Sequence, residues 1–413
     1  MPSGPVLEHC ALRPRLPAAR QRREAQAVAI VGGGLAGITA YATLRHGGIE
    51  PEEITVFGTD ADPAAAWRER ARAIRQRYMR SESDGHVAAT SFPGLAVRSA
   101  LGSRSPAPLA RSVCNRYHPT VDEFLAHVAD VRERSGWDES FVRARVERVG
   151  SMTDGFELEF VAQSHKLPAS LESEPLLQGE LEFVAQSHKL RRGIFRHVLI
   201  APGHPPLNMP PELADDPRAV HAYRPHEYAD EVEVLGAGMA AATEWLNALA
   251  AGARVISVRR REPERRPLNL PRALFTRRGL AAFHRTARDE RVGLLRCYSA
   301  PSYPPGREWD EPLRSVRFSV AAELNGAAQI ICATGFERGF RRDPLLRRLV
   351  DEHALESADD WIVLAPDSTV PALTDARRTL VLAGVPAQWA FPAADTIAGA
   401  KYAARGFLRR VVA

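Results

Sequence analysis

The sequence predicts an α/β fold, because two glycine-rich segments each follow a short apolar run and precede a helical pattern. The first, GGGLAG at residues 32–37, directly follows AVAIV at 27–31, and the second, GAGMAA at 236–241, directly follows VEVL at 232–235. A strand, such a turn and a helix in that order form the Rossmann-like unit that binds a dinucleotide. The sequence therefore predicts two Rossmann-like dinucleotide-binding domains, an arrangement suited to moving hydride between two bound dinucleotides.

We call these segments the first and second fingerprints. Gly32 allows a tight turn out of the strand, Gly34 lets backbone N–H groups approach a pyrophosphate, and Gly37 lets the helix pack closely on the strand. The N-terminus of the helix then directs free N–H groups and the positive end of its dipole toward the phosphates. In the second fingerprint the equivalent places are held by Gly236, Gly238 and Ala241.

Hydrophobic periodicity and turn residues predict the remaining elements. Strands are expected at 54–57, 141–149, 195–200, 255–258, 328–332 and 379–382, and helices over 35–44, 62–78, 121–133, 239–252 and from about 395 to the C-terminus. The stretch 81–120 is rich in Ser, Pro and Gly and is expected to form loops. The segment ELEFVAQSHKL at 157–167 recurs unchanged at 180–190, which we interpret as a local duplication that extends a surface hairpin or loop.

The two fingerprints define two nucleotide domains, and the resemblance to a known family given below implies that the second is inserted into the first. The first nucleotide domain is expected to be discontinuous, comprising residues 27–220 and 329–413, and the second, residues 221–328, is inserted between these parts. Residues 1–26 contain Pro and Arg without an apolar core, so they are expected to form a disordered tail.

Composition excludes several other classes of protein. The 413 residues exceed the size of one typical domain, and 55 basic against 50 acidic side chains leave a net charge of only +5, so binding to nucleic acid is not indicated. No apolar run is long enough to span a bilayer, so no membrane association is expected. The four cysteines have no close spacing, which argues against a structural zinc site and a redox-active disulfide and favours free thiols in the cytoplasm.

Side chains after the second strand of each unit indicate which dinucleotide binds. An acidic residue is expected there to bind ribose hydroxyls, and Asp60 is the candidate in the first unit. In the second unit Arg259 and Arg260 end the strand instead, and guanidinium groups favour a 2′-phosphate, hence NADPH over NADH. The alternative is a solvated basic strand end.

The chain resembles the flavin-containing, class B flavoprotein monooxygenases over about residues 27–405. The matching features are the two fingerprints, Trp67-Arg68, the linker ATGF at 333–336 with Thr334 and Gly335, and APG at 201–203 with Gly203. The resemblance implies that the first fingerprint holds FAD and the second holds NADPH. The family signature ahead of the second fingerprint is matched at His226, whereas Val220, Ala222 and Tyr228 depart from it.

The same resemblance implies a site. A loop containing Arg80, Ser81, Asp84 and His86 would reach the flavin face, where Arg80 could balance charge on the reduced ring and Asp84 or His86 could move protons; the alternative is a solvated turn. Asp395 and Thr396 begin the last helix, whose N-terminus would point at the flavin, or they are simple helix caps.

The expected function is that of an FAD-dependent oxidoreductase that takes hydride from NADPH. The resemblance implies a monooxygenase that acts on a small molecule with O2 through a flavin C4a-peroxide. The alternatives are an NADPH-dependent flavin reductase or dehydrogenase that passes electrons to a quinone or a protein, and a non-catalytic redox-sensing protein. Small-molecule substrate and O2 are the expected partners, no metal is expected, and a homodimer is left open.

Overall fold

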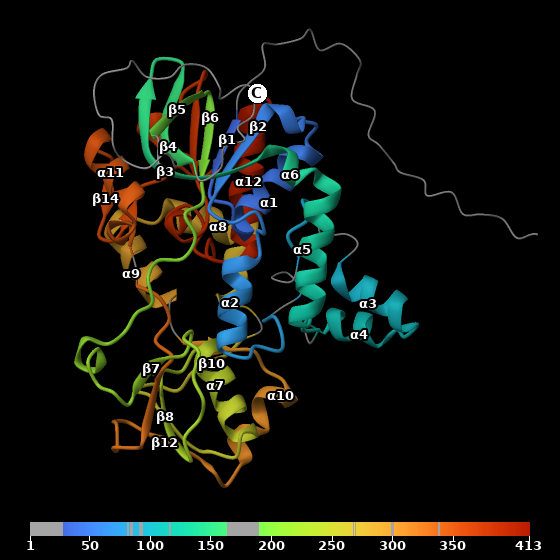
Figure 1. Ribbon diagram of the computed structural model, residues 1–413, viewed down its shortest axis with the longest axis vertical. Coiled ribbons are helices and arrows are strands. Elements are labelled where there is room, and N and C mark those ends of the chain that lie inside the picture. The colour runs from blue at the N-terminus through green and yellow to red at the C-terminus, as the bar shows by residue number, and fades with distance from the viewer. Residues whose placement is uncertain are drawn as a thin grey trace, which may run out of the picture.

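The computed structural model describes residues 28–80, 82, 86–90, 94–114, 117–162, 190–266, 268, 270–298, 301–337 and 339–413. The predicted tail 1–26 and the candidate residues Ser81 and Asp84 lie outside this range. Figure 1 shows two bodies, one around a large sheet at the top and one around a smaller sheet at the bottom, with helix α2 (Ala65–Ala73) running from the upper body toward the lower.

The larger sheet has seven strands in the order β16-β6-β1-β2-β3-β4-β5. Pairing is parallel from β16 to β3 and antiparallel from β3 to β5. The strands are β1 (Val28–Val31), β2 (Ile54–Gly58), β3 (Phe141–Met152), β4 (Gly155–Ala162), β5 (Leu190–Phe195), β6 (His197–Ile200) and β16 (Thr379–Leu382). Every residue of β1, β2, β6 and β16 is buried, as expected of parallel strands that are covered on both faces.

Helices cover one face of this sheet. They include α1 (Leu35–His46), α5 (Val121–Ser135), α6 (Trp137–Ser140) and α12 (Ile397–Val411). The hydroxyl of Tyr41 on α1 donates to the backbone O of Gly136 at 2.8 Å, and its ring meets the edge of Trp137 with centroids 5.4 Å apart. On the other face, Phe57 and Phe160 pack with centroids 4.9 Å apart. These contacts fix the sheet that carries the first fingerprint.

The smaller sheet is fully parallel, in the order β12-β9-β8-β13-β7. Its strands are β7 (Ala219–His221), β8 (Glu231–Leu235), β9 (Arg254–Val258), β12 (Phe318–Ala321) and β13 (Gln329–Cys332), and α7 (Met239–Ala250) packs on it through the buried Trp245. Because β13 lies between β8 and β7, this sheet extends beyond the expected limits of 221 and 328 at both ends. Strand pairing is long-range and leaves no local mark on the sequence.

Two pairs of helices are absent from the sequence-based expectation. The prediction that 81–120 forms loops is wrong at two places, where helices α3 (Leu95–Ser103) and α4 (Ala107–Val113) form. Gly94 and Pro106 stand at the N-terminal ends of these helices, so these residues mark helix boundaries and not loops. The other pair is α8 (Arg277–Arg285) and α9 (Arg288–Tyr298). Phe283 and Leu295 from this pair belong to the same apolar core as Phe57, so the inserted segment returns to the upper body.

The remaining helices and strands are short or peripheral. They are α10 (Arg307–Asp310), α11 (Pro344–His353), β10 (Glu264–Arg265), β11 (Ser302–Tyr303), β14 (Ser357–Ala358) and β15 (Trp361–Ile362). The described ends of the duplicated segments lie in β4 and β5, which are antiparallel neighbours at the edge of the larger sheet. Within the described part of the chain, no helix combines the length and the apolar character that crossing a bilayer requires.

Candidate functional site

The first fingerprint forms a turn whose three key glycines have distinct surroundings. Gly32 has φ +121°, and a Cβ there would lie 2.0 Å from the O of Ala201. A Cβ at Gly37 would lie 2.0 Å from the O of Gly32, whereas a Cβ at Gly34 would meet nothing within 4 Å. Gly34 stands at the N-cap of α1 and provides no side-chain cap, so the helix start is open to an anionic ligand.

The second fingerprint repeats this geometry. Gly34 and Gly238 have almost the same backbone conformation, φ −88° and ψ −164° against φ −87° and ψ −165°. Gly236 has φ +132°, and a Cβ at Gly238 would again meet nothing within 4 Å. Ala241 is buried in the place of the third glycine. Both turns therefore keep open the space that a pyrophosphate would occupy.

A cavity of about 290 Å³, which we call the junction cavity, lies where the two bodies meet. It is bordered by Gly238 of the second fingerprint, by Asp395 just before α12, and by Leu295 and Tyr298 of helix α9. Its lining includes Arg80, His204, Gly238, Tyr298, Phe336 and Asp395. Residues predicted for both dinucleotides, Gly238 for one and Arg80 and Asp395 for the other, thus border one space.

Three residues predicted to contact the first dinucleotide lie after β2 and on α2. Asp60 is exposed beside the first turn, and its Oδ1 accepts a hydrogen bond from the N of Asp62 at 2.9 Å. Trp67 packs edge-on against Phe124 with centroids 4.7 Å apart, and Arg68 pairs with Asp62 at 2.6 Å. Trp67 and Arg68 therefore support the region around the turn, and a direct contact of any of the three with a dinucleotide stays a prediction.

Arg80 ties the two bodies together. Its Nη2 donates to the O of Arg266 and the O of Leu268, both at 3.1 Å, and to the Oγ of Ser302 at 2.8 Å, while its Nη1 donates to the O of Ser302 at 3.1 Å. The guanidinium is thus oriented by carbonyls of the segment around β10 and β11. Its predicted role in balancing charge on reduced flavin stays a prediction.

His86 lies in a buried cationic environment. Its Nδ1 is 2.8 Å from the Nζ of Lys401 on α12, and its ring is edge-on to His127 with centroids 6.0 Å apart. Burial, followed by the charge of Lys401, lowers the pKa of His86 to about 3. His86 is therefore neutral near neutral pH. Sequence reasoning missed Lys401, although it is the sole lysine among the described residues.

The two arginines at the end of β9 have different surroundings. The guanidinium of Arg259 lies over the indole of Trp245 at 5.6 Å and pairs with Glu262 at 2.9 Å, and its side chain is only 8% exposed. Arg260 is exposed. The structure therefore separates a packed arginine from one that is accessible to a ligand.

The linker residues predicted for cofactor binding lie in two antiparallel segments that connect the bodies. Leu207 and Phe336 form a β-bridge, and the N of Asn208 donates to the O of Gly335 at 3.0 Å. Thr334 donates from its hydroxyl to the O of Asn208, and Gly203 has φ +91°. Sequence reasoning missed the packing here: Arg70 lies over the ring of Phe336 at 5.1 Å, and His204 stacks on that ring at 4.5 Å.

The start of α12 is capped by one of its two candidate residues. The Oγ1 of Thr396 accepts a hydrogen bond from the N of Gly399 at 3.2 Å, which identifies Thr396 as the N-cap. Asp395 precedes it, is exposed and borders the junction cavity.

A buried polar cluster links the loop after β7 to helix α7. The Oε2 of Glu244 is 3.1 Å from the Nε2 of His226 and accepts from the hydroxyl of Tyr228 at 2.8 Å, and Glu244 is fully buried. Burial lowers the pKa of His226, but the hydrogen bond and the negative charge of Glu244 outweigh burial, so the net effect raises this pKa. The sequence indicated His226 through the family signature but gave no sign of its partner, Glu244.

Among the described residues, no group of three or more His, Cys, Asp or Glu side chains is arranged to hold a metal ion. The groups available for a ligand are the open helix starts, the exposed Arg260 and the side chains around the junction cavity.

Solved structures with the same architecture include amine-hydroxylating enzymes. An ornithine N-hydroxylase of Kutzneria sp. 744, solved with reduced FAD, NADP+ and L-ornithine, aligns over 94% of this chain and 99% of its own with a TM-score of 0.66 at 15% identity. The ornithine hydroxylase from Pseudomonas aeruginosa aligns over 93% of this chain and 99% of its own, with a TM-score of 0.62 at 15% identity. The bacillithiol disulfide reductase from Bacillus cereus aligns over 94% of this chain and 98% of its own, with a TM-score of 0.54 at 15% identity.

Searches of the sequence against protein-family models and against curated proteins give no match. The structural comparison nevertheless confirms the predicted fold class. The chain has the α/β architecture with two Rossmann-type domains of the class B flavin-dependent monooxygenase structures.

Gly34, where a Cβ would meet nothing, and Gly37, where a Cβ would collide with the backbone, give a matched pair of substitutions. We expect Gly34→Ala to leave the fold intact and to abolish retention of FAD, because its Cβ fills only the space kept for the pyrophosphate. We expect Gly37→Ala to destabilise the protein by about 1–3 kcal/mol, because its Cβ collides with the backbone. Flavin absorbance after purification and chemical unfolding measure the two effects; a Gly34→Ala protein that keeps its flavin contradicts the assignment of the first turn.

The pair formed by His226 and Glu244 predicts a pH-dependent contribution to stability. A folded-state pKa raised above the unfolded value means that protonated His226 stabilises the fold fully below about pH 6.5, and that this contribution is lost as pH rises through the folded pKa. We expect His226→Gln to lower the free energy of unfolding by about 1–3 kcal/mol below about pH 6.5 and by less above the folded-state pKa of His226. Urea titrations of both proteins across the range measure this, and a difference that grows with pH would contradict it.

Proposed function

We propose that this protein is an FAD-dependent oxidoreductase that takes hydride from NADPH and acts as a monooxygenase on a small amine. The observation that carries the proposal is the pair of open helix starts at Gly34 and Gly238, one in each body, together with a junction cavity that joins residues assigned to both dinucleotides. Similarity to enzymes described as ornithine hydroxylases supports the monooxygenase and the amine.

The residues present fit both cofactors. A Cβ would fill the space above each of the two turns, so each turn has the shape that a pyrophosphate needs. Gly32, Gly34 and Asp60 would hold FAD, and Gly236, Gly238 and Arg260 would hold NADPH. When bound, NADPH supplies a hydride and FAD accepts it and reacts with O2.

The protein's own contribution is to orient, to exclude water and to hold protons. Leu270, Leu295 and Val385 give part of the junction cavity an apolar lining, against which a bound substrate would lose contact with water. Among the charged groups that border the same cavity, Glu337 pairs with Arg342 at 2.9 Å and Arg80 is positive, so the carboxylate of Asp395 is the group that would favour a cationic amine. Because its pKa is lowered to about 3, His86 is neutral and a poor proton acceptor near neutral pH, so its role in moving protons stays a prediction.

The second candidate function is an NADPH-dependent reductase that passes electrons to another acceptor. It is favoured by the likeness to the bacillithiol disulfide reductase structure. Among the described cysteines, Cys114 and Cys297 are exposed and free, and burial raises the pKa of Cys332 to about 11, so Cys332 is a poor nucleophile. An external acceptor such as a quinone therefore fits this alternative better than a disulfide within the chain.

One experiment separates the two functions. We expect NADPH to bleach the bound flavin in the absence of O2, and admission of O2 with ornithine, lysine or a diamine to yield a hydroxylamine product. Mass spectrometry of the product and consumption of NADPH measure this. Bleaching followed by rapid transfer to a quinone, without hydroxylated product from any amine, would support the reductase instead.

The two arginines after β9 provide a test of NADPH selectivity. We expect Arg260→Ala to raise the dissociation constant for NADPH about tenfold and to change that for NADH little, because the lost guanidinium would contact only the 2′-phosphate. Arg259→Ala is the matched comparison: it removes packing over Trp245, so we expect lower thermal stability. Equal affinity of wild type and Arg260→Ala for NADPH would contradict the assignment.

A further inference from the structure

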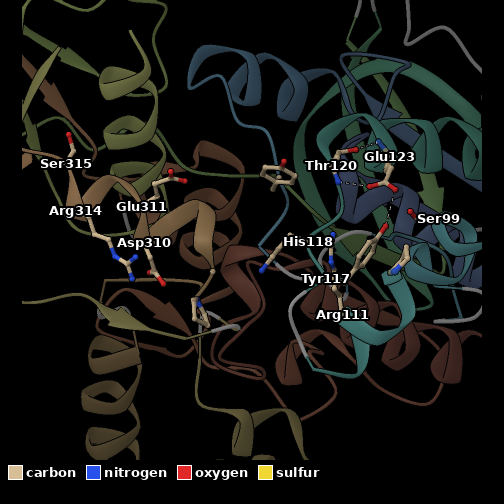
Figure 2. A pocket seen from close by; sticks show the side chains of 14 residues that line it. Ser99, Arg111, Tyr117, His118, Thr120, Glu123, Asp310, Glu311, Arg314 and Ser315 are labelled. Atoms are coloured by element: carbon tan, nitrogen blue, oxygen red, sulfur yellow. Dashed lines mark hydrogen bonds between the residues drawn. The ribbon is translucent and has the colours of Figure 1, made fainter. Parts of the chain in front are cut away.

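The two bodies are separated by a large interdomain cleft on one side. This cleft has a volume of about 1370 Å³. Figure 2 shows Asp310 and Arg314 on one wall, across the space from Tyr117 and His118 on the other. A neighbouring cavity of about 490 Å³ shares the side chain of Tyr78 with the cleft and is bordered by Arg75. The bodies are therefore not packed together here, and their relative orientation depends on local ties.

One of these ties is the C-terminal end of α2, which reaches from the upper body to the lower (Figure 1). The side chain of Ile74 is buried in the apolar core of the smaller sheet. The Nδ2 of Asn247 on α7 donates to the O of Ile74 at 2.7 Å. The end of α2 is thus seated on the helix that begins at the second fingerprint.

Arg75 lies two residues beyond the last residue of α2, in a conformation that an L-residue seldom adopts. Its φ is +45°, its N donates to the O of Arg72 at 3.0 Å, and the N of Gln76 donates to the O of Ala71 at 2.8 Å. This pair of bonds is the Schellman motif, in which the left-handed position is usually glycine. Arginine therefore stands at a position where glycine would be unstrained, and the contacts of its side chain are the observation that bears on its role.

That side chain contacts the loop after β7 in three ways. The Nη2 of Arg75 donates to the O of His226 and to the Oε1 of Glu227, both at 3.1 Å. Its guanidinium also lies over the ring of Tyr228 at 4.9 Å. Glu244 on α7 in turn holds His226 and Tyr228 from the buried side. Arg75 therefore grips a loop that is fixed to the helix of the second fingerprint.

We propose that Arg75 is a positioning residue that fixes the orientation of the second nucleotide domain relative to the first, so that the two dinucleotides meet in a geometry suited to hydride transfer. The inference rests on the proposed function. Hydride transfer requires the reacting atoms to be close and aligned, and a small misplacement slows it steeply. Arg75 touches neither dinucleotide turn, so its removal affects alignment while leaving each binding site in place.

The decisive variant is Arg75→Gly, because glycine removes the grip and also relieves the left-handed backbone. We expect its thermal stability to equal or exceed that of wild type and its dissociation constant for NADPH to change little. We expect the rate constant for flavin reduction at saturating NADPH to fall roughly tenfold to a hundredfold in anaerobic stopped-flow measurements. A rate constant equal to that of wild type would overturn the proposal.

Three comparisons complete the test. Arg77→Ala removes the same charge from an exposed side chain two residues away and is expected to keep the wild-type rate constant. Arg75→Lys keeps the charge but lacks the guanidinium fork, so we expect an intermediate rate constant. Glu227→Gln removes only the exposed ion pair and is expected to have a small effect, because Glu227 is 93% exposed. A slow Arg77→Ala together with a fast Arg75→Gly would assign the effect to charge and reject the grip.

Failure of the proposed function has a different signature. If the wild-type flavin is reduced by dithionite but not by NADPH, the protein is not an NADPH oxidoreductase. The proposed function then fails, and with it the role of Arg75 in hydride transfer. If NADPH reduces wild type and Arg75→Gly at the same rate, the oxidoreductase stands and only the positioning role is rejected.

Discussion

The structure depends on two helices that begin without a side chain in front of them. At Gly34 and Gly238 the chain leaves a parallel strand and enters a helix with nearly the same dihedral angles, and neither residue offers a side-chain cap. Helix α12 differs, because Thr396 satisfies one of its first N–H groups. Free N–H groups at a helix start are costly unless water or a ligand pairs with them. Gly238 borders the junction cavity together with Arg80 and Asp395, which are predicted to lie near the other dinucleotide.

The two fingerprints differ in how tightly they are constrained. In the first, Gly37 lies so close to the O of Gly32 that no other residue fits, whereas the second accommodates Ala241 at the equivalent place. Glycine is therefore required at the third position of the motif only where the helix backbone lies in contact with the turn at the end of the strand. The glycine before each helix has no such steric cause within the protein, which leaves an incoming ligand as the reason for it.

Guanidinium groups connect the parts of this arginine-rich chain. Arg80 reaches carbonyls around β10 and β11, Arg75 reaches the loop that carries His226, and Arg70 lies over Phe336 in a linker. A planar group with several donors can bind carbonyl oxygens, a carboxylate and a ring face at once, which suits it to contacts between the two bodies. Of these contacts, those of Arg75 lie beside the interdomain cleft and its neighbouring cavity, where the two bodies are not packed together.

The sequence by itself determined the two strand-turn-helix units, the positions of the larger sheet's buried strands along the chain and the last helix, because glycine sterics and apolar periodicity act over a few neighbouring residues. It could not place β13 in the smaller sheet, nor return α8 and α9 to the upper body, because pairing and core packing join residues far apart in the chain. The partners of Arg80 and Arg259 and the buried contact between His226 and Glu244 were likewise decided only by tertiary structure. The type of a charged side chain limits the groups that it can bind, but the fold decides which of those groups lies close enough to bind.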